Sequence, residues 1–232
     1  MTNQNLALIV GAGFGLSASV ARLLYRNGWK VILFSRNDKK LSSLCKEIDA
    51  ISFSGDASDK DAISKLFENI DNNIGSPNFV LYNPSYRVRQ PFLELDPEDV
   101  SRAIQISALG GFFVGQQAAK RMLASGDGGA IFFTGASASV KGYSQSAPFA
   151  MGKFALRGLS QSMARELHPK GIHIAHFVID GSIRSKNRTE NKEKPDSLLD
   201  PDAIAQTYLN ILNQPRNSWT SEIEIRPWVE QF

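Results

Sequence analysis

The sequence LALIVGAGFGL, residues 6–16, decides the fold. Its first five residues are apolar and predict a buried parallel strand, because a strand that is covered on both faces need not alternate. Gly11, Gly13 and Gly15 follow at once, and residues 16–26 then carry apolar side chains at helical spacing. The glycines let the backbone approach a pyrophosphate, and the helix amides attract its charge. A plain strand-to-helix turn is the alternative, but glycines this dense inside such a pattern favour a nucleotide site.

Length and composition set broad limits on the function. The chain has 232 residues, enough for one large α/β domain, and its net charge of +3 comes from scattered basic residues, which argues against a nucleic-acid partner. Cys45 is the single cysteine, so an intrachain disulfide is excluded and a reducing compartment such as the cytoplasm is expected. No apolar run approaches the roughly 18 residues of a membrane span, and the apolar start is too short for a signal peptide. His173 and His176 point to opposite sides of one strand, so we expect no metal site.

Strand and helix patterns alternate along the whole chain. We expect strands at residues 6–10, 30–35, 51–54, 78–82, 130–134, 172–179 and 222–225. We expect helices at residues 16–26, 39–48, 59–70, 99–123, 148–167 and 201–212. This alternation predicts an α/β fold, a doubly wound parallel sheet, in a single domain of residues 1–232.

Arg36 stands at the end of the second expected strand, where dinucleotide folds place the residue that reads the ribose. An acidic residue there binds a 2′-hydroxyl group, whereas an arginine suits a 2′-phosphate. Ser35 and Arg36 offer no acid, so the sequence favours NADP over NAD. The alternative is a solvated arginine that begins the next helix.

The chain as a whole resembles a short-chain dehydrogenase/reductase. Its glycine turn is similar to that family's TGxxxGxG, with Val10 for the threonine, Gly11 and Gly15 retained, and Ser17 for the last glycine. The other family motifs have counterparts in the right order. Asp56 matches the acid that holds the adenine, and Tyr82-Asn83-Pro84-Ser85 stands where the family has NNAG. Residues 180–185 stand where the family has PGxxxT, with Asp180 for the proline and Ser185 for the threonine.

The resemblance implies a Rossmann fold and an oxidoreductase that acts on a small molecule with a carbonyl or alcohol group. It also implies a homodimer or homotetramer formed through the two long helices. The cofactor-binding residues that it implies, together with those expected from the glycine turn and the second strand, are Gly11, Gly13, Phe14, Gly15, Leu16, Arg36, Asp56, Ala57, Asn83, Lys153, Ile183 and Ser185.

The catalytic positions depart from the family pattern. In the family, a tyrosine exchanges a proton with the substrate oxygen, and a lysine four residues later holds the ribose and lowers the pKa of that tyrosine. Here Lys153 is present, but residue 149 is Phe, whose ring cannot give or take a proton. The family's substrate-orienting serine falls at Ala136, with Ser137 beside it, and the asparagine of its proton relay falls at Ser107.

Other residues can stand in for the missing acid. Tyr143 lies on the loop before the helix of Lys153, although loop tyrosines more often line a pocket. Ser137 follows a strand end and is expected to face the ligand crevice, and a water held by Lys153 and Ser107 is a third proton source. The catalytic candidates are therefore Lys153, Ser137, Tyr143 and Ser107. The alternative function is a catalytically silent NADP-binding sensor or partner subunit, because Phe149 lacks the hydroxyl group.

Three further features allow two interpretations each. Gly110-Gly111 permits a close helix approach, either at an oligomer interface or within the subunit. Residues 184–194 form either a lid over the cofactor and substrate or a solvated loop. Trp219, Trp228 and Phe232 pack either at a subunit interface or in the core. The residues expected around the substrate are aromatic and basic, which leaves room for an acidic or an aromatic carbonyl compound.

Overall fold

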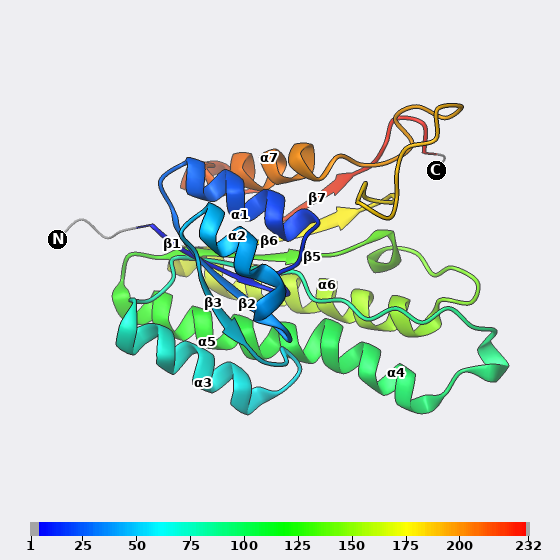
Figure 1. Cartoon of the computed structure of the whole chain (residues 1–232). Helices are drawn as coiled ribbons and strands as arrows, with labels where there is room; N and C mark the ends of the chain where they lie inside the picture. The colour runs from blue at the N-terminus through cyan, green and yellow to red at the C-terminus, as the bar shows by residue number, and fades with distance from the viewer. Residues whose placement is uncertain (1–4, 231–232) are drawn as a thin grey trace.

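A single sheet of seven parallel strands organises the chain, and the computed structural model describes residues 5–230 (Figure 1). The strands are β1 (Leu6–Val10), β2 (Lys30–Ser35), β3 (Ile51–Ser54), β4 (Phe79–Tyr82), β5 (Gly129–Thr134), β6 (Ile172–Ile179) and β7 (Glu222–Ile225). Their order across the sheet is β3-β2-β1-β4-β5-β6-β7. The predicted doubly wound parallel sheet is confirmed, with each strand within one residue of its expected bounds.

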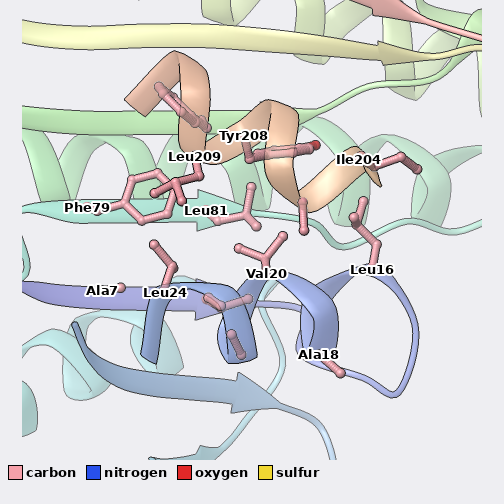
Figure 2. Close-up of a cluster of buried hydrophobic side chains, with 14 of the residues drawn as sticks. Ala7, Leu16, Ala18, Val20, Leu24, Phe79, Leu81, Ile204, Tyr208 and Leu209 are labelled. Atoms are coloured by element: carbon pink, nitrogen blue, oxygen red, sulfur yellow. The ribbon is translucent and has the colours of Figure 1, made fainter. Parts of the chain in front are cut away.

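Helices cover both faces of this sheet. They are α1 (Leu16–Arg26), α2 (Ser42–Glu47), α3 (Lys60–Asn73), α4 (Pro97–Ile104), α5 (Gly110–Ser125), α6 (Ala147–Leu167) and α7 (Pro201–Leu212). Helices α1, α2 and α7 lie on one face, and α3, α5 and α6 lie on the other (Figure 1). Figure 2 shows Leu81 of β4 near Val20 of α1 and Tyr208 of α7, and these residues belong to one buried cluster on this face of the sheet.

The strand register brings three chain turns to one edge of the sheet. Val10 at the end of β1 pairs with Phe34 of β2 on one side and with Tyr82 of β4 on the other. The residues that follow, Gly11 and Asn83 among them, therefore leave the sheet at the same level. Because the chain crosses to opposite faces after β1 and after β4, a crevice opens between these two strands, which is the usual ligand site of such sheets.

Two helices differ from their expected form. The expected helix at residues 39–48 begins as a 3₁₀ turn, Asp38–Leu41, and becomes α-helical only in α2; such tighter turns are frequent at helix starts. The long helix expected at residues 99–123 begins two residues earlier, where Asp96 caps α4 by accepting a hydrogen bond from the Glu98 amide. It is also widened between α4 and α5 by a π-helical turn, Gln105–Leu109.

The paired glycines of the long helix face inward. A Cβ atom at Gly110 would lie 2.5 Å from the carbonyl oxygen of Ala57, and one at Gly111 would lie 2.7 Å from Cδ1 of Leu156. The close approach that these glycines permit is therefore made within the chain, which confirms packing inside the subunit over an oligomer interface.

The aromatic residues near the C-terminus have different surroundings. Trp219 stacks on His173, with ring centroids 4.7 Å apart, whereas Trp228 is 80% exposed. Phe232 lies outside the described residues. No helix within residues 5–230 is long and apolar enough to cross a membrane.

Replacement of Gly110 by alanine is expected to lower the free energy of unfolding by about 1–3 kcal/mol, because the added methyl group overfills a closed contact. Gly158→Ala, on α6, is the matched control: no atom lies within 4 Å of the added carbon, and the better helix former should raise stability by up to about 1 kcal/mol. Denaturant unfolding followed by circular dichroism measures both changes. Equal effects of the two substitutions would contradict the assigned packing.

Candidate nucleotide-binding and active site

A cavity of about 420 Å³ opens at the carboxyl ends of β1, β2 and β4. Its lining includes many of the predicted cofactor residues, namely Gly11, Gly13, Phe14, Arg36, Asp56, Ala57 and Asn83. These residues come from four different turns of the chain, and the strand register alone brings them together. The cavity lies at the crevice predicted from the glycine turn.

The glycine turn leaves backbone amides open to this cavity. Gly11 has φ +80°, and a Cβ atom there would lie 2.7 Å from the nitrogen of Pro84, so only glycine fits. The amides of Gly13, Phe14 and Gly15 donate no hydrogen bond to another described residue, and a Cβ atom at Gly13 would have no neighbour within 4 Å. Free amides beside the N-terminus of α1 fit the phosphates of a dinucleotide.

A side-chain brace fixes the shape of the turn. The Ser17 hydroxyl donates to the carbonyl oxygen of Gly11 at 3.1 Å, and the side-chain amide of Asn83 donates to the Ser17 hydroxyl at 2.7 Å. The backbone N–H of Asn83 also donates a hydrogen bond to the carbonyl oxygen of Val10, at 3.0 Å. The sequence analysis noted Ser17 only as a departure from the family glycine, whereas here it joins the turn after β1 to the turn after β4.

Charged groups gather at the other end of the cavity. Arg36 lies exposed on its rim and forms no ion pair with another described residue. Burial raises the pKa of Asp56, but hydrogen bonds from Ser58 and the charges of Arg36 and Arg102 outweigh it, so the pKa is lowered. Lys40 also lines the cavity; the sequence analysis missed it, although it follows Arg36 by only four residues.

Some predicted cofactor residues lie outside the cavity lining. Leu16 is buried in the core, and Ile183 packs against the same core cluster. Ser185 is exposed, in a turn closed by hydrogen bonds with Arg188. The next residue, Lys186, lies 6.0 Å from the ring centroid of Phe14, so this segment reaches the glycine turn from the outside. Its role as a lid stays a prediction.

Lys153 is buried at the centre of the remaining site. Its Nζ donates a hydrogen bond to the carbonyl oxygen of Thr134, at the end of β5, at 2.8 Å. Its nitrogen also lies 6.0 Å from the ring centroid of Phe149, one turn earlier on α6. Burial disfavours the charged ammonium and lowers the pKa of Lys153 to about 8.

Ser107 approaches the same helix from the π-helical turn. Its side chain is fully buried, and its hydroxyl group has no hydrogen-bond partner among the described residues. A Cβ atom at Gly152 would lie 3.0 Å from that hydroxyl oxygen, so glycine at this position admits Ser107 beside the residue that precedes Lys153. The structure thus places Ser107 against Gly152, the residue before Lys153, and the catalytic roles of Ser107 and Lys153 stay predictions.

Ser137 and Tyr143 lie on the segment between β5 and α6. Ser137 begins the 3₁₀ turn Ser137–Ser139, is half-buried, and makes no side-chain hydrogen bond to another described residue. Tyr143 is 45% exposed, and the Nζ of Lys141 lies 5.7 Å from its ring centroid. Interaction with the Tyr143 side chain, and then the charge of Asp180, raise the pKa of Lys141. An ammonium group therefore accompanies this tyrosine.

A buried acid–base pair lies on the α6 face of the sheet. The Nδ1 atom of His176 is 3.1 Å from a carboxylate oxygen of Glu222, its neighbour across β6 and β7. Arg157 of α6 binds both oxygens of that carboxylate, at 2.6 and 2.7 Å. Burial, and to a smaller degree the charge of Lys153, lower the pKa of His176 to about 4. As predicted, His173 lies on the opposite face of β6 from His176. There its ring stacks on Trp219.

Comparisons with known proteins agree with this geometry. Residues 5–196 match the family profile described as short chain dehydrogenase. The structure of a short-chain dehydrogenase from Rhodopseudomonas palustris superposes on this chain with a TM-score of 0.84 and is 34% identical in sequence. The superposition covers 97% of this chain and 100% of the other. An uncharacterized oxidoreductase of Staphylococcus aureus (strain N315) is 24% identical over 233 residues, which is 97% of each chain.

Solved structures of lower identity share the fold. One of them is an alcohol dehydrogenase from the archaeon Thermococcus sibiricus, complexed with 5-hydroxy-NADP. It superposes with a TM-score of 0.85 at 20% identity, and the superposition covers 98% of both chains. The family profile spans most of the chain, and the seven-stranded sheet and the glycine turn agree with it. The chain is therefore a member of the short-chain dehydrogenase/reductase family of oxidoreductases.

Proposed function

We propose that this protein is an NADP-dependent reductase of a small carbonyl compound in which the proton reaches the substrate without the usual tyrosine. The single observation that carries the proposal is that a crevice with open backbone amides lies at the same edge of the sheet as a buried lysine, Lys153, whose neighbour at position 149 is phenylalanine. When bound, NADPH supplies the hydride that reduces a carbonyl carbon. The protein residues must hold the cofactor and provide the proton for the carbonyl oxygen.

The preference for NADP rests on two cations at the rim of the cavity. Arg36 and Lys40 both line it, and Arg36 carries no partner carboxylate. Asp56, the acid of this region, lies after β3, and its Oδ1 atom accepts hydrogen bonds from the amide and hydroxyl group of Ser58. An unpaired guanidinium group suits a 2′-phosphate, which accepts two parallel hydrogen bonds from it.

The remaining cofactor contacts follow from the open backbone. Gly13, Phe14 and Gly15 present amides to the phosphates, and Asn83 borders the same crevice. Lys153 is assigned to the ribose nearest the reacting carbon by its resemblance to the family lysine. Ile183 and Ser185 are assigned to the nicotinamide end by the same resemblance.

The proton is assigned to Tyr143, with Ser137 as a donor to the substrate oxygen. The ammonium group of Lys141 lies against Tyr143, which places a positive charge beside a phenol, as Lys153 does for the tyrosine in the family pattern. Ser137 has an uncommitted hydroxyl group at the end of β5. A water between Ser107 and Lys153 is the second route, and the buried, unpartnered hydroxyl of Ser107 supports it.

The protein is further proposed to act as a homodimer or homotetramer. Leu109 and Phe112 on the long helix, and Met151 and Phe154 on α6, are each between 42% and 48% exposed. Such an apolar face fits a second copy of the chain. The single cysteine, Cys45, supports a place in the cytoplasm.

The cofactor preference is tested by titrating NADPH and NADH into the protein. We expect NADPH to bind at least about tenfold more tightly than NADH, and Arg36→Ala to remove that difference while leaving NADH binding unchanged. Lys39→Ala, an exposed neighbour outside the cavity lining, should change neither affinity. Equal affinities for the two nucleotides in the unmodified protein would show that the preference is wrong.

The proton route is tested by NADPH oxidation over a panel of carbonyl compounds. Tyr143→Phe is expected to reduce the rate by about 10²-fold or more, because general acid catalysis contributes at that scale. Tyr25→Phe is the control, since Tyr25 is 44% exposed on another helix, much as Tyr143 is 45% exposed. A full rate in Tyr143→Phe would move the assignment to the Ser107 water.

Phe149→Tyr restores the family hydroxyl group and should raise the rate on the same panel. If only Phe149→Tyr turns over, while both proteins bind NADPH, the reductase proposal fails for the natural chain. That outcome would instead favour a silent NADP-binding protein.

The pH dependence of the reaction should report Lys153. Because burial lowers its pKa to about 8, the ammonium group is present below that pH and lost above it. The rate of carbonyl reduction is therefore expected to fall as the pH rises through about 8. Lys153→Met should flatten this profile between pH values of about 7 and 9. An unchanged descent in the variant would assign the titration to another group.

The oligomeric state is measured by analytical ultracentrifugation. We expect the double substitution Phe112→Glu and Phe154→Glu to convert the assembly to monomers, because carboxylates would be buried in the contact. Tyr25→Glu, on the opposite layer of the fold, should leave the assembly intact. A monomeric unmodified protein at about 10 μM would contradict the proposal, since obligate assemblies are far tighter.

A further inference from the structure

Two cations flank the phenylalanine that replaces the family tyrosine. The Cζ atom of Arg87 lies 5.4 Å from the ring centroid of Phe149, and the Nζ of Lys153 lies 6.0 Å from the same centroid. Phe149 is half-buried, and Arg87 is exposed. The surroundings of this position are therefore apolar at the ring and positive next to it.

The charge of Arg87 is not neutralised within the described part of the chain. Five of the twelve other arginines have carboxylate partners, namely Arg22, Arg121, Arg157, Arg184 and Arg226. Arg87 forms no ion pair and donates no hydrogen bond to a described residue. Asp99, an acid on α4, already has a hydrogen-bond partner: its Oδ1 atom accepts a hydrogen bond from the Tyr86 hydroxyl group at 2.7 Å.

The loop that carries Arg87 is held at both ends. On one side, the hydrogen bond from Tyr86 to Asp99 ties it to α4, and Arg102 lies over the Tyr86 ring at 5.1 Å. On the other side, the amide of Gln90 donates to the carbonyl oxygen of Gln145 at 3.1 Å, just before α6. A guanidinium group presented by an anchored loop has less freedom to lose when it binds an anion.

We propose that Arg87 binds a carboxylate of the substrate, and that the substrate is an oxo acid whose carboxylate lies next to the reduced carbonyl. A guanidinium group matches a carboxylate through two parallel hydrogen bonds, which orients the ligand as well as holding it. The carboxylate is unchanged in the reaction: hydride adds to the carbonyl carbon, a proton adds to its oxygen, and a hydroxy acid leaves. This inference deepens the proposed reductase function and rests on it.

The first test is a binding measurement that needs no turnover. Oxamate, a 2-oxo acid analogue that is not reduced, is titrated by calorimetry into the complex of the protein with NADPH. We expect Arg87→Gln to weaken oxamate binding about 10- to 100-fold and Arg87→Lys to weaken it less, because a lysine keeps the charge but not the paired hydrogen bonds. Arg89→Gln removes the same charge from the same loop and should change the affinity less than about twofold.

The second test compares a charged substrate with its uncharged methyl ester. Phenylglyoxylate and its methyl ester carry the same reducible carbonyl group. Arg87→Gln should lower kcat/KM for the acid by about tenfold or more and leave that of the ester unchanged. Preference for the ester in the unmodified protein would overturn the inference.

The outcomes separate this inference from the proposed function. NADPH is titrated first: if it does not bind, the reductase proposal fails, and the inference that rests on it falls as well. If NADPH binds but oxamate does not, only the inference is overturned. Equal losses in Arg87→Gln and Arg89→Gln would overturn it too, since they would show a general field of the loop and not a specific contact.

Discussion

The in-register pairing of β1 with β2 and β4 is the constraint on which the rest of the structure depends. Val10 is opposite both Phe34 and Tyr82, so three turns leave the sheet at one level. A slip of one residue would exchange the two faces of a strand, and this is disfavoured because each face packs against a different cluster of buried side chains. The nucleotide crevice is therefore fixed by the core, before any side chain at its rim is considered.

A second constraint is the burial of a positive charge. Lys153 is held by the carbonyl oxygen of Thr134, and the adjacent ring of Phe149 offers a π face but no proton acceptor. Removing an ammonium group from water disfavours its charge, and one hydrogen bond does not fully replace the lost hydration. Burial of the His176 ring, and to a smaller degree the charge of Lys153, lower the pKa of His176, so this side chain is neutral at neutral pH.

Much of the fold follows from short-range patterns in the sequence. The strands and the helices α1 and α7 were predictable because their apolar residues repeat with a clear period and their ends carry turn residues such as Gly28, which has φ +81°. The π-helical turn at Gln105–Leu109 was not predictable, because it depends on a contact distant in sequence: the Tyr82 hydroxyl donates to the carbonyl oxygen of Ile106. Sequence spacing alone does not reveal such a tertiary hydrogen bond.

The candidate site divides in the same way. The open amides of the glycine turn and the position of Arg36 could be inferred, since both follow from the end of a strand. The link from Asn83 to Ser17, and the place of Arg87 over Phe149, could not, because each joins segments that are more than 60 residues apart in the chain. A close contact between such segments exists only once the sheet has formed.

The two halves of the candidate site are constrained by different kinds of atoms. The cofactor half is built mainly from backbone amides and a positive-φ glycine, so changing it means changing the fold around Gly11. The proposed catalytic half depends on single side-chain atoms carried by α6, whose buried face holds both Lys153 and Leu156. Exchanging a tyrosine for Phe149 removes one oxygen and leaves the packing of α6, set by residues such as Leu156, undisturbed. The fold can therefore keep its nucleotide crevice while the source of the proton moves, and an unpaired cation such as Arg87 gains influence over which substrate is bound, because the ring beside it makes no polar contact.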